Sequence, residues 1–175
     1  PGAFLQADNP DYFLMRLDGI LAELMVQVAP SLYRKYVTSN AKGKPILYVQ
    51  LEKAVYGMMK SALLFYRKLV ADLTSQGYEI NPYDPCVANK NINGKQMTIC
   101  WHVDDLFVGH ADPNVVTDFL KWLANRYDTA EKKLNITRGH RHDYLGMTID
   151  FSHDDAVAFD MIPYIQKIFT AFPEK

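Results

Sequence analysis

Apolar residues recur at intervals of three and four in two long segments of the chain, which is the period of a helix that buries one face. The first set is Met58, Ala62, Phe65, Leu69 and Leu73. It predicts a helix over residues 57–75, which Gly77 ends. The second set is Val116, Leu120, Leu123 and Tyr127. The helix that it predicts begins at Asp112-Pro113, where the aspartate can act as the N-cap and the proline can occupy the first turn.

Short apolar runs bounded by turn residues predict strands around these helices. They lie at 13–17, 46–51, 86–92, 95–103, 106–110, 143–151 and 156–161. Asn93-Gly94 is a strong signal for a two-residue hairpin turn, which would place Cys86 opposite Trp101. A second reversal is expected at Asp104-Asp105, because the residues that follow are again strand-like.

Two further helices are expected, one that ends before Pro30 and a short one over 163–172. Helices and hairpins thus alternate along the chain, an order that predicts an α+β fold in which helices cover one face of an antiparallel sheet. The length of 175 residues allows one domain with a core, or one domain and part of another.

The composition limits the classes of function that are compatible with this chain. A net charge of −1 argues against a surface that binds nucleic acid everywhere, although a local basic groove is compatible with it. Cys86 and Cys100 lack metal-type spacing and are expected on opposite sheet faces, which argues against a disulfide. No apolar run is long enough to span a membrane, so no membrane partner is expected. The segment 139–143, GHRHD, lacks two further ligands for zinc at plausible spacing.

Asp104 and Asp105 interrupt an apolar run, MTICWHVDDLFVGH, and this is the main chemical signal in the chain. Two carboxylates about 4 Å apart repel each other by roughly 4 kcal/mol at an effective dielectric constant near 20. A solvated Asp-Asp turn is one explanation. No lysine or arginine lies within five residues on either side, however, so a hard divalent cation, Mg²⁺ above all, is the other.

The same residues resemble a known family. HVDD, at 102–105, is similar to the Tyr-x-Asp-Asp box of reverse transcriptases, with His102 in the tyrosine position. GAFLQAD (2–8), LEKAVYGMMKSALLFYRKL (51–69), GYEINPYDPCVA (77–88) and DYLGMTID (143–150) resemble, in the same order, segments of the copia-type (Ty1/copia) retrotransposon reverse transcriptase. The likeness spans residues 2–151.

The resemblance implies an RNA-directed DNA polymerase, a transferase that performs nucleotidyl transfer from a dNTP to a primer 3′-hydroxyl with two Mg²⁺ ions. Asp104 and Asp105 would be catalytic residues and metal ligands. The nucleotide-binding residues would be Phe4, which excludes a 2′-hydroxyl, together with Gly57 and Ser61 at the start of a helix. The primer grip would comprise Tyr144, Leu145 and Gly146.

The resemblance also implies a palm domain with a ferredoxin-like core over residues 1–151, with part of the fingers or a connection at 12–50, and the palm end or start of the thumb at 152–175. The first-motif aspartate would lie upstream of Pro1, so the palm would be incomplete at its N-terminus and this segment alone inactive. The partners would be an RNA or DNA template–primer duplex and the rest of a retroelement polyprotein: fingers, thumb and RNase H. The location would be the cytoplasm, including a virus-like particle, or the nucleus.

Other interpretations stay open beside these. By position alone, Phe4 is equally consistent with a core aromatic, and Gly57 with a simple turn. Replacement of the family's tyrosine by His102, and of its Gln and Pro in the 51–69 segment, is compatible with an inactive retroelement remnant or a nucleic-acid-binding module.

Overall fold

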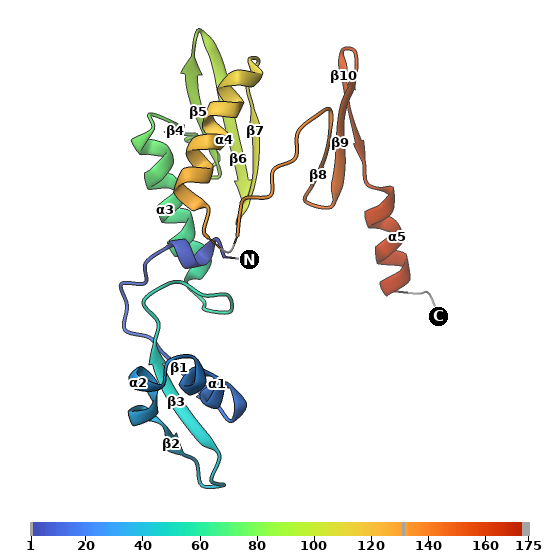
Figure 1. Cartoon of the computed structure of the whole chain (residues 1–175). Coiled ribbons are helices and arrows are strands. Elements are labelled where there is room, and N and C mark those ends of the chain that lie inside the picture. The colour runs from blue at the N-terminus through green and yellow to red at the C-terminus, as the bar shows by residue number, and fades with distance from the viewer. Residues whose placement is uncertain (1, 131, 173–175) are drawn as a thin grey trace. The chain divides into compact units, whose positions relative to one another are not determined.

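Two structural units follow each other along the chain, divided in sequence between Lys68 and Leu69. The computed structural model shown in Figure 1 describes residues 2–130 and 132–172. The division falls within helix α3 (Ser61–Ser75), so that each unit contains one part of this helix. The domain boundary predicted at 151/152 and the assignment of 12–50 to the fingers stay predictions.

The first unit contains a small antiparallel sheet in the order β1-β3-β2. Its elements before α3 are 3-10 helix η1 (Phe4–Gln6), β1 (Leu14–Asp18), α1 (Ile20–Val28), α2 (Pro30–Tyr33), 3-10 helix η2 (Arg34–Tyr36), β2 (Thr38–Ser39) and β3 (Pro45–Gln50). Leu17 and Leu47 are paired across β1 and β3 and form a buried core with Ala22 of α1. The predicted strands near 13–17 and 46–51, and the helix that ends before Pro30, are confirmed to within two residues.

The second unit contains a four-stranded antiparallel sheet in the order β4-β5-β6-β7 and a three-stranded one in the order β10-β9-β8. After α3, its elements are β4 (Glu79–Ile80), β5 (Val87–Ile92), β6 (Lys95–His102), β7 (Asp105–Gly109), α4 (Pro113–Tyr127), β8 (Arg141–Tyr144), β9 (Met147–His153), β10 (Ala156–Asp160) and α5 (Ile162–Ala171). The described residues thus form a mixed α and β structure with antiparallel sheets, as predicted, although three sheets stand where one was expected.

Helix α4 and the end of α3 lie against one face of the four-stranded sheet (Figure 1). Period-two alternation along the strands places one set of apolar side chains on this face. The buried sheet residues are Ala88, Met97, Ile99 and Trp101, and the buried helix residues are Leu69, Leu73, Phe119 and Leu123. The apolar positions predicted for the second helix omitted Phe119. Its ring packs edge-on against that of Tyr78, with 5.8 Å between the ring centroids.

A buried carboxylate connects α3 to α4. Arg126 donates hydrogen bonds to the two Asp72 oxygens at 2.8 and 3.1 Å, and the Tyr127 hydroxyl donates to Asp72 at 2.7 Å. Burial, followed by the hydrogen bond to Asp72, raises the pKa of Tyr127 above its usual value, so this phenol stays a hydrogen-bond donor. No sequence signal indicated that Asp72 would be buried, because an aspartate on a helix is usually exposed to solvent.

Two sequence predictions about element boundaries are wrong. Helix α3 begins at Ser61 rather than at residue 57, because Gly57 has φ +88° and lies in the turn before the helix. The strand predicted over 143–151 is a hairpin of β8 and β9, since Leu145 and Gly146 both have positive φ and reverse the chain. The pattern of apolar residues in this segment gave no indication of the turn.

The hairpin of β5 and β6 is confirmed. Asn93 and Gly94 have φ +54° and +76°, as a tight hairpin turn requires, and Ile92 stands opposite Lys95. Cys86 and Cys100 are free thiols, as expected. None of the described helices is long and apolar enough to cross a membrane.

Candidate active site

The hairpin of β6 and β7 carries the paired aspartates. His102 and Asp105 are the last pair of the ladder, so the turn consists of Val103 and Asp104. The reversal expected at Asp104-Asp105 is therefore displaced by one residue. Asp104 occupies the turn itself, whereas Asp105 is the first residue of β7 and its side chain is set by the alternation of the strand.

Val103 has φ +55°, a left-handed conformation that is uncommon for a β-branched residue. Left-handed backbone at such a residue costs about 1–2 kcal/mol, and conformations of this kind gather at functional sites. The strain sits directly beside Asp104, in the turn that sets its position.

We expect the Val103→Asn variant to be more stable than the parent by about 1 kcal/mol, since asparagine tolerates the left-handed conformation. Val103 is 42% exposed, so little packing is lost. Urea denaturation followed by tryptophan fluorescence measures the change. A loss of stability would show that contacts of the valine side chain outweigh the backbone strain.

The pairing register places the Asp105 carboxylate on the face of the sheet away from α3 and α4. Trp101 and Leu106 are Cα partners in the ladder, and Trp101 is buried on the helix-covered face. Asp105 and Phe107, each one residue from Leu106, therefore point to the opposite face. The sheet thus places the Asp105 carboxylate at its end, on the face away from α3 and α4.

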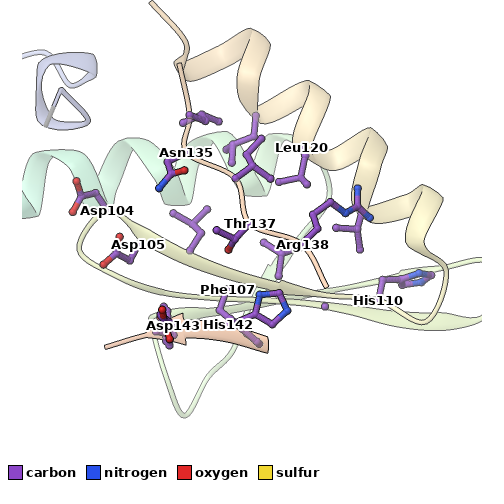
Figure 2. A pocket seen from close by; sticks show the side chains of 18 of the residues that line it. Asp104, Asp105, Phe107, His110, Leu120, Asn135, Thr137, Arg138, His142 and Asp143 are labelled. Carbon is purple, nitrogen blue, oxygen red and sulfur yellow. The ribbon is translucent and has the colours of Figure 1, made fainter. Parts of the chain in front are cut away.

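Asp104 and Asp105 line one end of a groove of about 450 Å³ within the second unit. Figure 2 shows the two aspartates at one end and His110 and Arg138 toward the other. Apolar side chains form much of the wall between: Leu106, Val108, Val116, Leu120, Leu123 and Ile136. Both aspartates are exposed, and they border one end of this concavity.

Tyr144, predicted in the primer grip, lines the same groove. The centroid of its ring lies 5.4 Å from the ring centroid of Phe107 on β7. Burial first, then the neighbouring Cys100 and Asp105, raises the pKa of Tyr144 to about 12, and its side chain shares a hydrogen bond with that of Cys100. Leu145 and Gly146 form the turn after it, and a Cβ on Gly146 would come within 3.2 Å of Tyr164.

The three predicted nucleotide-binding residues lie in the first unit. Phe4 is buried, with its ring 4.4 Å from that of Tyr56 and 6.0 Å from that of Phe65. Ser61 is buried as well and donates its hydroxyl hydrogen bond to the Val55 carbonyl. Open space surrounds the position where Gly57 would carry a Cβ. Their roles toward a nucleotide stay predictions.

Six polar residues in the groove had not been predicted as site residues: His110, Asn135, Thr137, Arg138, His142 and Asp143. Arg138 donates to the Thr117 hydroxyl at 2.7 Å and the Pro113 carbonyl at 3.1 Å, which secures the segment after α4 to the start of that helix. Asp143 accepts a hydrogen bond from Thr148 at 2.7 Å. The GHRHD segment was considered only as a zinc site, which was not expected, and its last two residues, His142 and Asp143, line the groove from strand β8.

The carboxylates offer the hard oxygen ligands that Mg²⁺ prefers. No group of three or more His, Cys, Asp or Glu side chains that could hold a metal occurs within residues 2–130 and 132–172. Two carboxylates nevertheless suffice for Mg²⁺, which commonly keeps several waters and binds through one or two carboxylates together with substrate phosphates. The donor set therefore fits a magnesium ion that shares its ligands with a phosphate-bearing substrate.

Comparison with known proteins agrees with this chemistry. A family model described as Reverse transcriptase (RNA-dependent DNA polymerase) matches residues 7–173. The chain is 27% identical over 164 residues to the transposon Ty1-DR1 Gag-Pol polyprotein of Saccharomyces cerevisiae, and 28% identical over 154 residues to the truncated transposon Ty1-A Gag-Pol polyprotein of the same yeast. The alignments cover 90% and 84% of this chain, but 9% and 12% of the relatives.

No solved structure matches the chain. The family match covers nearly all of the sequence, including the aspartate hairpin, the groove and the β8–β9 turn. The chain therefore belongs to the reverse transcriptase (RNA-dependent DNA polymerase) family and is of the Ty1/copia type.

Proposed function

We propose that this chain contributes the palm of an RNA-directed DNA polymerase, in which Asp104 and Asp105 are the catalytic carboxylates. The observation that carries the proposal is their position on the β6–β7 hairpin at the end of a groove, in a chain of the reverse transcriptase family. The four-stranded sheet with α3 and α4 would be part of the ferredoxin-like core of the palm.

Magnesium bound to these carboxylates would lower the pKa of the attacking hydroxyl and offset the negative charge of the triphosphate. The chain itself supplies a fixed position for the ligands, because Asp105 belongs to the β6–β7 ladder and the turn restricts Asp104. Tyr144 lines the groove beside the aspartates and would help to orient the primer end.

The remaining assignments are proposals of the same kind. Phe4 would select against a 2′-hydroxyl, Gly57 and Ser61 would border the incoming dNTP, and Leu145 and Gly146 would complete the primer grip. The partners would be an RNA or DNA template–primer duplex and the other parts of a Gag-Pol polyprotein, as the names of the relatives suggest. Synthesis would take place in the cytoplasm, inside a particle, or in the nucleus.

The complete polypeptide that carries residues 1–175 should extend a labelled DNA primer on an RNA template when dNTPs and Mg²⁺ are present. Extension should stop when EDTA removes the metal and recover when Mg²⁺ is added in excess. Electrophoresis of the primer at timed intervals measures the rate. A folded polypeptide that extends no primer on either RNA or DNA would overturn the proposed activity and favour a remnant without catalysis.

A further inference from the structure

The second unit contains two antiparallel sheets, and no ladder among the described residues joins them. Strand β7, which follows the paired aspartates, is an edge of the four-stranded sheet, and β8 is an edge of the three-stranded one. Backbone hydrogen bonds therefore hold the carboxylate hairpin in one sheet and the β8–β9 turn in the other. The distance between these two parts of the site depends on side chains that reach from one sheet to the other.

Phe107 on β7 makes this contact. It lies two residues after Asp105, so the two side chains share a face of the sheet. The centroid of the Phe107 ring lies 5.4 Å from that of Tyr144, 5.5 Å from that of His142 (Figure 2) and 6.3 Å from that of Phe151. Tilted, edge-on and stacked rings at such separations attract each other. One side chain beside the carboxylates thus packs against rings from both β8 and β9.

Cys100 on β6 reinforces the same contact. It is the Cα partner of Phe107, and its thiol donates to the Phe107 carbonyl with 3.7 Å between sulfur and oxygen. Its side chain also shares a hydrogen bond with that of Tyr144. Burial, the largest cause, raises the pKa of the Cys100 thiol, so the thiol is protonated at neutral pH. Phe107 and Tyr144 are therefore connected both by their rings and through this thiol.

We infer that Phe107 is a positioning residue, whose ring contacts with β8 and β9 set the distance between the β8–β9 turn and the carboxylates of Asp104 and Asp105. The inference rests on the proposed function in one respect, since this distance matters if the turn holds a primer end that reacts at the carboxylates. A displacement of about 1 Å from the reactive geometry can lower a rate about a hundredfold. A role in packing alone would change the fraction of folded protein, but not the rate at which each folded molecule reacts.

Single-turnover extension by the complete polypeptide separates these two roles, because the amplitude counts competent complexes and the rate constant measures their reaction. With a labelled DNA primer on an RNA template, saturating dNTP and Mg²⁺, Phe107→Leu should lower the rate constant about tenfold and leave the amplitude unchanged. Phe107→Tyr keeps the ring and should react at the rate of the parent. Cys100→Ala should lower the rate constant about threefold, whereas Cys100→Ser keeps a hydroxyl that can bond with Tyr144 and should restore it.

Two leucine substitutions elsewhere in the second unit are the matched controls. Phe119 is buried on the helix-covered face of the four-stranded sheet, where its ring packs against that of Tyr78. Phe119→Leu should lower the free energy of unfolding without a change in the rate constant. Phe159, on β10, is 62% exposed and does not line the groove. Phe159→Leu should change neither quantity.

The thiol of Cys100 reports on the ring contact without any catalysis. Its alkylation by N-ethylmaleimide becomes faster when the thiol is more exposed, and mass spectrometry of the peptides measures it separately from the alkylation of Cys86. Without Mg²⁺ and nucleic acid, Phe107→Leu should increase the alkylation rate of Cys100 about tenfold, because loss of the ring lets the two sheets separate locally. Phe107→Tyr and the two controls should keep the rate of the parent.

Circular dichroism establishes that each variant is folded before the rates are compared. An unchanged rate constant for Phe107→Leu, an equal loss for Phe107→Tyr or Phe119→Leu, or alkylation of Cys100 in Phe107→Leu at the rate of the parent would each overturn the inference. The two proposals fail in different ways. A parent that extends no primer overturns the proposed function, whereas a parent that extends at the same rate as Phe107→Leu overturns the inference alone.

Discussion

Replacing either aspartate of the β6–β7 hairpin, as Asp104→Asn or Asp105→Asn, is expected to lower the rate of primer extension by at least about a hundredfold. Asparagine keeps the size and the turn preference of aspartate, but it removes the charge that a divalent cation requires. Metal stabilisation of phosphoryl chemistry contributes several kcal/mol to the transition state, and each 1.36 kcal/mol corresponds to a factor of ten in rate.

The chain contains its own control for this experiment. Asp154 and Asp155 follow His153 and form the turn between β9 and β10, where Asp155 has φ +59°. This second twin-aspartate hairpin is exposed and does not line the groove. The Asp154→Asn/Asp155→Asn variant removes two carboxylates from another two-residue hairpin turn of the second unit and should leave extension unchanged.

Steady-state extension kinetics at saturating Mg²⁺, with each variant first shown to be folded, distinguish the outcomes. A rate unaffected by Asp104→Asn or Asp105→Asn would refute the assignment of that residue. An equal fall in the Asp154/Asp155 control would mean that net charge, rather than a metal site on the β6–β7 hairpin, accounts for the effect.

The second large effect is expected on stability. Asp72→Ala should lower the free energy of unfolding by about 3 kcal/mol, because it leaves the buried Tyr127 hydroxyl without this acceptor and removes a pair of hydrogen bonds to Arg126. The Arg126 side chain is half exposed, so water can solvate it in the variant. This places the expected loss at the lower end of the range for broken buried pairs.

Asp118→Ala is the matched control, since Asp118 forms an exposed pair with Lys121 one turn along α4. Such surface pairs contribute less than about 1 kcal/mol. Urea unfolding curves of the parent and both variants provide the comparison, and Tyr127→Phe completes a double-mutant cycle with Asp72→Ala. A loss below 1 kcal/mol for Asp72→Ala would show that the α3–α4 contact depends on apolar packing alone.

Local sequence signals determined most of the strands and turns. Asn93-Gly94 specified both the turn and the register of β5 and β6, and Asp112-Pro113 began α4, whose N-cap aspartate accepts from Asn114 at 2.8 Å. These signals work because the hydrogen bonds involved join residues close in sequence. The spacing of apolar residues alone misplaced the start of α3 and merged β8 with β9. This pattern does not indicate a turn at a glycine, such as Gly57 or Gly146, when apolar residues lie on both sides of it.

Sequence by itself also singled out Asp104 and Asp105, from their apolar flanks and the absence of a nearby cation. It did not indicate which residues would surround them: Asp143 and Tyr144 line the groove from β8, and Arg138 lines it from the segment after α4. Nor did it predict the burial of Asp72. Burial and concavity depend on which distant segments pack together, and no spacing along one segment contains that information. The paired carboxylates were therefore recognisable in the sequence, whereas the groove that they border was decided by tertiary structure.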